Sequence, residues 1–476
     1  MRRGFVRLAR RSLPCALGAI LLIAAASCAG GGGETEADAV ETPEELEARA
    51  REIHERVITA DTHKDISDNF APTDGSDGED PNERAGRKVD LPQMREGGLD
   101  LVFFVVYVGQ GQGNLDDEGY TNALGAAMSK FDGIHRMVDE LYSDQIGLAT
   151  SAAEAEQIAA EGKLVAAIGV ENGYPMGDDI AVIARFKELG AGYMGITHNG
   201  HNQLGDSNTA GWYGTEEEPQ RALHGGLSEL GRAAIAEMNR QGIMVDISHA
   251  GKQTMMEALE VSQAPVIASH SSVTALRDHP RNLDDEQLLA LKENGGVMQT
   301  VALGNYVKDP APRNDAIAAL REEMGLPAAR GRGGRGGRGG GRRGGGGRRG
   351  GAATEQPELS EEERAEREAL QAEFERRVAA EIDPDLGPAN VQDFVDHIDY
   401  VVNLIGIDYV GISSDFDGGG GIEGWDNAAE TFNVTHEMVK RGYTEEEIAK
   451  VWSGNLLRVW REVEEVAQRI QAEEGR

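Results

Sequence analysis

Short apolar runs, rich in β-branched residues, alternate along this chain with longer stretches of helical or loop character. The runs are Val57 to Ala60, Leu99 to Val108, Leu164 to Val170, Gly192 to Ile196, Ile243 to Ile247, Pro265 to Ala268, Gly296 to Leu303 and Tyr409 to Ile412. Helical patterns such as Ile180 to Leu189 and Leu227 to Gln241 separate them. This alternation is typical of βα units around a parallel sheet, and the eight runs predict an α/β fold, a (β/α)8 TIM-like barrel.

The barrel domain is expected at 42–465, because a helix signal opens it. Thr42-Pro43-Glu44-Glu45 combines an N-cap Thr, a Pro at the first helical position and a capping-box Glu. The predicted helix runs toward Arg56.

One segment inside this domain cannot form a core. Residues 330–351 are almost entirely Arg and Gly, and they predict a disordered insertion, 326–358, before the eighth strand. An acidic helical stretch from Ser360 to Ala380 follows. The insertion is similar to an RNA-binding RGG box; the alternative, which we favour for an exported chain, is a loop whose arginines are neutralised by the acidic body.

The first residues resemble a bacterial export signal, 1–28, followed by a flexible tether, 29–41. Five arginines precede an apolar run from Ala16 to Ala26, which is too short to span a bilayer. Ala25-Ala26-Ser27-Cys28 resembles a lipobox, with Ala25 in place of the usual Leu. The pattern predicts an exported protein on the periplasmic or cell-surface side, anchored in the membrane by lipidated Cys28. Ordinary cleavage and secretion are the alternative.

Charge and cysteine content narrow the possible partners and metal ligands. The formal net charge of -35 disfavours nucleic acid, because an acidic surface repels phosphate backbones. The two cysteines, Cys15 and Cys28, both precede the predicted domain. A metal in that domain must therefore be held by His, Asp and Glu.

Such residues follow the predicted strands at the end where a parallel barrel builds its active site. They are His63 and Asp65 after the first run, Glu171 after the third, His198 after the fourth, His249 and His270 after the fifth and sixth, and Asp415 and Asp417 after the eighth. Each motif alone has an ordinary explanation, such as a surface pair, a core histidine or a turn cap. Together they predict a metal site.

The spacing indicates which of these side chains would bind the same cation. His63 and Asp65 lie two apart, on one face of an extended segment, and can grip one cation. His249 and His270 lie at matching heights on neighbouring strands, about 4.8 Å apart, and can bind a second cation together. A single Glu between two ligand pairs supplies the bridging anion that a two-metal site needs. One of the two aspartates after the eighth run is a candidate general acid/base, and spacing does not decide which.

In this order the motifs resemble the membrane (renal) dipeptidase family, the zinc metallopeptidases of family M19, in a bacterial lipoprotein-like form. The resemblance runs from about Ile58 to Trp460, and it implies a barrel of the metal-dependent hydrolase type. Further matching motifs are Gly226-Leu227-Ser228, Glu237-Met238-Asn239-Arg240, His279-Pro280-Arg281-Asn282, His397-Ile398-Asp399-Tyr400 and Gly454-Asn455-Leu456-Leu457-Arg458.

The resemblance implies two zinc ions and a role for each residue. His63 and Asp65 would hold one zinc, His249 and His270 the other, and Glu171 would bridge them. Asp415 would be the acid/base residue, His198 would steady the oxyanion, and Arg281 would bind the substrate carboxylate. The hypothesis is a dipeptidase in which a hydroxide between the metals attacks the peptide carbonyl and Asp415 passes a proton to the amine. Dipeptides with a C-terminal D-residue are among the expected substrates.

Three departures from the family pattern concern the surroundings of the site. Lys64 stands where relatives usually have Asn, and Asn172-Gly173-Tyr174 replaces a turn with Gly and His. Val301-Ala302-Leu303 replaces an Asn and an aromatic residue, so the pocket is expected to differ in width or polarity.

Two other functions remain open from the sequence. One is a binuclear barrel amidohydrolase acting on lactones, cyclic amides or phosphoesters, although those usually carry His-x-His after the first strand. The other is a non-catalytic, metal-binding envelope lipoprotein. The expected partners are dipeptides and the membrane, with a homodimer left open and no nucleic acid.

Overall fold

The computed structural model describes residues 41–72, 78–84, 86–111, 115–327 and 360–475. They belong almost entirely to one compact unit, Pro43–Arg476. The predicted signal 1–28 with Cys28, the tether up to residue 40 and the Arg-Gly segment lie outside the described residues. In the described part of the chain no helix is both long and apolar enough to cross a membrane.

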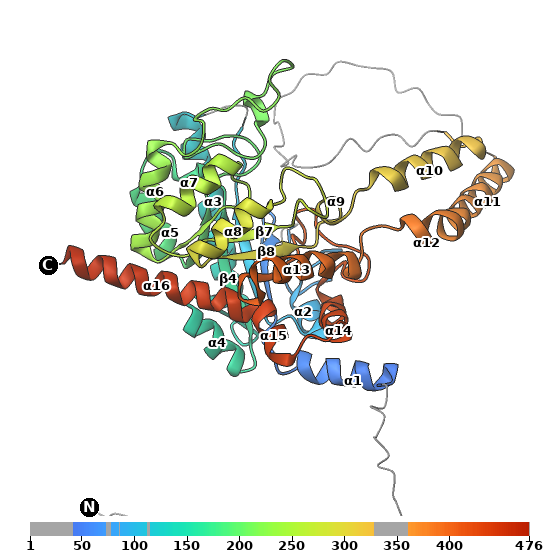
Figure 1. Cartoon of the computed structure of the whole chain (residues 1–476), viewed down its shortest axis with the longest axis horizontal. Helices are drawn as coiled ribbons and strands as arrows, with labels where there is room; N and C mark the ends of the chain where they lie inside the picture. The colour runs from blue at the N-terminus through green and yellow to red at the C-terminus, as the bar shows by residue number, and fades with distance from the viewer. Residues whose placement is uncertain (1–40, 73–77, 85, 112–114, 328–359, 476) are drawn as a thin grey trace, which may run out of the picture. The chain divides into compact units, whose positions relative to one another are not determined.

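A parallel sheet forms the centre of this unit (Figure 1). Its strands are β1 Ala60–Asp65, β2 Leu101–Tyr107, β3 Ile146–Leu148, β4 Leu164–Glu171, β5 Ala191–Gly195, β6 Met244–Asp246, β7 Ile267–Ser271, β8 Val297–Val301 and β9 Val410–Ser413. They follow one another in the order β1-β2-β4-β5-β6-β7-β8-β9, and β3 pairs with β4 off this path. The predicted TIM-like barrel is confirmed, with every predicted run contributing one strand.

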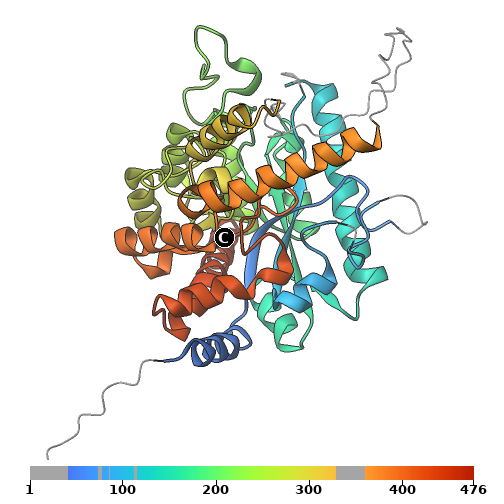
Figure 2. The same ribbon diagram turned by 90° about the vertical axis from the view of Figure 1, so that its right-hand side faces the viewer.

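Helices surround the sheet, as Figures 1 and 2 show from two directions. They are α1 Pro43–His54, α2 Leu91–Gly97, α3 Asp117–His135, α4 Ala152–Ala160, α5 Ala181–Glu188, α6 Glu229–Gln241, α7 Lys252–Val261, α8 Asp285–Asn294, α9 Gly304–Val307, α10 Ala311–Glu323, α11 Glu361–Arg377, α12 Asp383–Leu386, α13 Val391–Ile405, α14 Phe432–Lys440, α15 Glu445–Ala449 and α16 Asn455–Glu474. The predicted helices at 42–56, 180–189, 227–241 and 360–380 correspond to α1, α5, α6 and α11.

The apolar core has two main parts, because the side chains of a barrel strand alternate between its inside and its outside. The inner cluster includes Phe103, Tyr193 and Val297, and Trp460 of α16 packs against it. The larger outer cluster fills the space between sheet and helices. A third, small cluster of Leu320, Phe374, Val378 and Ile382 joins α10, α11 and the segment that follows α11.

The barrel is nearly closed, and its seam lies between β9 and β1. Backbone pairing there is sparse: the Asp65 N–H donates to the Phe416 carbonyl at 3.0 Å. The buried Asp61 carboxylate adds further contacts, since its Oδ1 accepts from the backbone N–H groups of Ser414 at 2.8 Å and His63 at 3.1 Å. Its Oδ2 accepts from the Ser414 hydroxyl. Burial raises the pKa of Asp61 to about 6, although these hydrogen bonds oppose the rise.

Two details differ from the sequence prediction. The first strand begins at Ala60 and continues to Asp65, so His63 and Asp65 lie within the strand and do not follow it. The reason is pairing, because β1 finds its register with β2 only from Ala60 onward, opposite Leu101. The short strand β3 was not predicted, and it is stabilised by pairing with the first three residues of β4, Leu164 to Ala166.

Candidate metal centre and active site

Seven predicted side chains meet at the carboxyl end of the barrel strands. His63 and Asp65 come from β1, Glu171 ends β4, and His270 lies on β7. His198, His249 and Asp415 follow β5, β6 and β9. Three sets of potential metal ligands have their donor atoms within 4.8 Å of one another: His63, Glu171, His270; Glu171, His198, His249; and His63, Asp65, Asp415.

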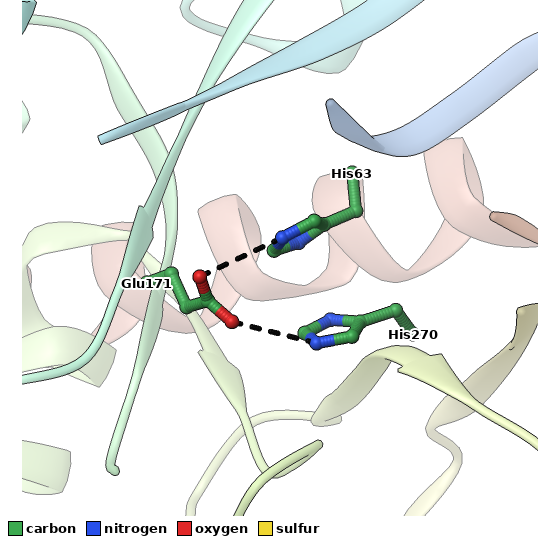
Figure 3. Close-up of side chains that lie close together, drawn as sticks. All are labelled: His63, Glu171 and His270. Carbon is green, nitrogen blue, oxygen red and sulfur yellow. Dashed lines mark ion pairs between the residues drawn. The ribbon is translucent and has the colours of Figure 1, made fainter. Parts of the chain in front are cut away.

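Glu171 lies at the centre of this group and faces different histidines with its two oxygens. Its Oε1 lies 2.9 Å from Nε2 of His249 and 3.4 Å from Nε2 of His270. Its Oε2 faces His63, whose Nε2 is 3.7 Å away, and Figure 3 shows the carboxylate beside the two rings, with one oxygen directed at His63 and the other at His270. The two oxygens of this one carboxylate thus face different histidines.

Asp415 and Asp417, which the sequence did not distinguish, point to different places. Asp415 Oδ1 lies 3.8 Å from Nε2 of His63. Asp417 instead accepts from the Lys88 N–H at 3.1 Å and lies 3.5 Å from the Lys64 ammonium. Both aspartates have left-handed backbone, with φ of 57° and 64°. Gly418 leaves room for the carboxylates of Asp65 and Asp415, because a Cβ there would collide with Oδ2 of Asp65 and Oδ1 of Asp415.

Burial shapes the electrostatics of the site. It raises the pKa of the Glu171 and Asp415 carboxyls well above their usual range, and nearby Asp65 raises both further. Burial, with the positive charge of Arg281, lowers the pKa of His63 and of His198 to about 3. The imidazoles are therefore neutral and have lone pairs for a cation, and the positive charge of Arg281 only partly opposes the rise in the pKa of the two carboxyls.

The donor set fits divalent cations. Nε2 of His63 is buried and has no hydrogen-bond partner among the described residues. Nε2 of His249 and Nε2 of His270 face each other at 3.0 Å. Nitrogen lone pairs that converge beside carboxylates are the arrangement that a bound cation stabilises, and imidazole with carboxylate suits zinc.

Arg281 lies behind the histidines and is fully buried. Its guanidinium donates to the carbonyls of Ser248 and, at 3.2 Å, of His270. Its Nε has no partner within the described ranges. The backbone therefore holds the guanidinium in place, while its buried Nε–H donates to no atom of the described residues.

Several contacts around the site were not predicted from the sequence. Asn172 donates to Val108 O at 2.9 Å and to Gln110 at 2.8 Å, and Gln110 donates to Gly200 O at 2.7 Å. These bonds connect the loops after β2, β4 and β5. The Tyr107 ring packs against the His198 ring at a tilt of 51°, with ring centroids 4.4 Å apart. The only sequence feature that pointed to Tyr107 is its position at the end of a predicted strand.

Lys64, the departure between His63 and Asp65, is completely buried. Its ammonium forms an ion pair with Glu79 and lies 5.3 Å from the ring centroid of Phe70. Glu79 also accepts from the Ser67 N–H at 2.9 Å. The ion pair therefore ties the segment after β1 to the strand that carries His63 and Asp65.

Comparison with known proteins gives consistent results. Residues 47–474 match the family described as membrane dipeptidase, peptidase family M19. Dipeptidase aclJ of Aspergillus oryzae is 29% identical over 386 residues, 80% of this chain and 72% of that protein. Dipeptidase tcpJ of Claviceps purpurea is 29% identical over 405 residues, 84% of this chain and 73% of that protein.

Solved structures resemble the fold over most of its length. The crystal structure of the probable dipeptidase PvdM from Pseudomonas aeruginosa has a TM-score of 0.69 and 28% identity, covering 90% of this chain and 100% of that chain. A metallopeptidase from Rhodobacter sphaeroides, crystallised with a phosphinate mimic of the dipeptide L-Ala-D-Ala, shares the fold with a TM-score of 0.57. Its identity is 20%, over 86% of this chain and 99% of that one.

The Lys64–Glu79 pair leads to a stability prediction. Lys64→Met leaves the buried Glu79 carboxylate without its main partner, so we expect a loss of about 3–5 kcal/mol in the free energy of unfolding. Adding Glu79→Leu removes the unpaired charge, and most of the loss should return. Denaturant unfolding with chelator present measures both variants without a contribution from bound metal.

Lys252→Met is the matched control. Lys252 pairs with Asp284 at 2.6 Å on the surface, where both side chains are partly exposed. Such a pair contributes roughly 0–1 kcal/mol. Equal losses for Lys64→Met and Lys252→Met would contradict the importance of the buried pair.

Proposed function

The chain belongs to the membrane dipeptidase family and is a metallo-dipeptidase, and we propose that it hydrolyses dipeptides with two zinc ions held around Glu171. One observation carries the two-ion proposal: Glu171 directs Oε1 toward His249 and His270 and Oε2 toward His63. A carboxylate that faces ligands on both sides is the bridging anion that paired cations need.

The ligands divide into two groups about this carboxylate. His63 and Asp65 would hold one ion, and His249 and His270 the other. The close approach of Nε2 of His249 to Nε2 of His270, at 3.0 Å, supports the second pair. When bound, such ions activate water for attack and polarise the peptide carbonyl.

Asp415 is the proposed acid/base residue. It is buried beside His63, and its raised pKa suits a carboxyl that takes up a proton and returns it to the leaving amine. His198 stacks on His249 with ring centroids 4.3 Å apart, within reach of a substrate held between the ligands. There its imidazole would donate to the oxygen that becomes negative during the reaction.

Arg281 is proposed to select substrates with a free C-terminal carboxylate. Two backbone carbonyls already orient its guanidinium, so little side-chain entropy is lost on binding. The Nε edge can pair with a carboxylate through two N–H groups. A carboxylate held there favours short peptides, in which the scissile bond and the terminus lie one residue apart. Dipeptides ending in a D-residue belong to this proposed substrate class.

Export and membrane attachment are also part of the proposal. The basic start of the chain, the apolar run that follows and the lipobox-like sequence ending at Cys28 support lipid anchoring on the outer side of a membrane. Labelling of cells with a radioactive fatty acid tests it: the label should enter the protein and be lost in Cys28→Ser.

Dipeptide hydrolysis with and without metal tests the central proposal. We expect the zinc-loaded protein to cleave a panel of L,L- and L,D-dipeptides, and chelator to abolish cleavage. Asp415→Asn should lower kcat about 100- to 10,000-fold, because it removes proton transfer. Asp408→Asn, a change of the same chemistry at an exposed position, is the control and should retain activity. Full activity in Asp415→Asn would rule out its role.

Amidated substrates test the role of Arg281. The wild type should prefer a dipeptide over its C-terminal amide, because the amide cannot form the charged pair. Arg281→Ala should lower kcat/KM for the free dipeptide about 10- to 100-fold and leave that for the amide nearly unchanged. An equal fall for both substrates would show that Arg281 acts through the structure of the site and not through the carboxylate.

A further inference from the structure

Two buried hydroxyl groups contact the imidazole rings on the side away from Glu171. The Tyr193 hydroxyl lies 3.2 Å from Nδ1 of His63, and the Ser269 hydroxyl lies 2.8 Å from Nδ1 of His270. We propose that Tyr193 and Ser269 are positioning residues that hold these two rings with Nε2 directed at the metal site. The inference rests on the proposed zinc function and adds two residues that have no part in the reaction itself.

The hydrogen bonds of Ser269 determine which His270 nitrogen carries the proton. The Ser269 hydroxyl donates to Oδ2 of Asp246 at 2.7 Å, because a carboxylate oxygen accepts. Its single proton is then used, so Nδ1–H of His270 must donate to the Ser269 oxygen. Nε2 of His270 consequently keeps its lone pair for a cation.

Asp246 is itself held in place, so the chain of bonds is rigid. Its Oδ1 accepts from the backbone N–H groups of Ser269 at 2.8 Å and Ser248 at 3.1 Å. The Ser248 hydroxyl accepts from the His270 N–H at 2.9 Å. β6 and β7 are therefore joined directly beneath the ligand.

Tyr193 does the same for His63. Its hydroxyl donates to the Thr62 carbonyl at 3.0 Å, which can only accept. With the His63 proton on Nδ1, that proton bonds to the Tyr193 oxygen, and every donor in the group has a partner. A proton on Nε2 would have none, since the nearest carboxylate oxygens to it are 3.7 and 3.8 Å away.

Packing fixes the tyrosine ring. Tyr193 is fully buried and stacks on Phe103 with ring centroids 5.3 Å apart. Gly169 on β4 makes this possible, because a Cβ there would collide with the Tyr193 ring. The rings of His63 and His270 lie 3.9 Å apart, centroid to centroid.

His249 provides the contrast. Its Nδ1 is buried and has no partner in the part of the chain that the structure describes. Its orientation comes from Nε2 contacts and from ring packing against His198 and His270. The proposal therefore concerns His63 and His270 and makes no such claim for His249.

Zinc titration of the full chain against a competing chelator tests the proposal. Tyr193→Phe and Ser269→Ala remove one hydroxyl each and keep the packing. We expect each variant to weaken zinc binding about 10- to 100-fold, as loss of an orienting partner does. Tyr193→Phe should act on the ion held by His63, and Ser269→Ala on the other, so different steps of the two-step isotherm should shift.

Ser271→Ala is the matched control, because Ser271 lies on the same strand as Ser269 and its hydroxyl has no partner among the described atoms. It should bind zinc with the wild-type constants. Unfolding of the metal-free variants separates positioning from stability: a purely structural role would lower the unfolding midpoint of the metal-free protein and leave the zinc constants unchanged. Wild-type zinc constants in Tyr193→Phe and Ser269→Ala, or an equal loss in Ser271→Ala, would overturn the proposal.

The outcome is independent of the reaction. A wild type that binds two zinc ions and cleaves no dipeptide would remove the proposed function while the affinity comparison still decides the positioning roles. A wild type that cleaves dipeptides, with unchanged zinc affinity in both variants, would remove the positioning roles alone.

Discussion

The buried carboxylate of Asp61 closes the barrel and builds the site in one set of contacts. It accepts from the Ser414 hydroxyl and from the N–H groups of Ser414 and His63, across the seam where strand pairing is sparse. Those bonds bring the histidine of the first strand next to Asp415, which follows Ser414. Asp246 plays the same role between β6 and β7, where it accepts from the N–H groups of Ser269 and Ser248, the residues that precede His270 and His249. Each carboxylate joins neighbouring strands and, in doing so, sets the position of a ligand.

The burial of further carboxylates in the site explains why it suits cations. Glu171 and Asp415 are buried, and the imidazoles around them are neutral. Lys64 is paired with Glu79, and the positive charge of Arg281 offsets only part of the effect of burial on Glu171 and Asp415. Buried carboxylates without a counter-charge are costly. Divalent cations supply the missing charge, so metal binding and stability of the site are coupled.

The sequence revealed the strands because burial on both faces of a parallel sheet demands continuous apolar runs. It also indicated the candidate ligands, since polar side chains directly after such runs are expected where they face the rim of a barrel. It placed the start of the first strand too early, because Val57 and Ile58 continue the apolar pattern although β1 pairs with β2 only from Ala60. It missed β3, whose three residues are too few to form a pattern.

Sequence alone thus determined the barrel, the membership of His63, Asp65, Glu171, His198, His249, His270 and Asp415 in one rim, and the absence of thiol ligands from the predicted domain. These are properties of residue type and order along the chain. Tertiary structure decided that Asp415, and not Asp417, faces His63, because two left-handed residues turn their side chains to different sides. It also decided that Tyr193 and Ser269 stand behind the histidines and that Glu79 meets Lys64. Contacts between residues distant in sequence depend on register, twist and packing, which no local pattern records.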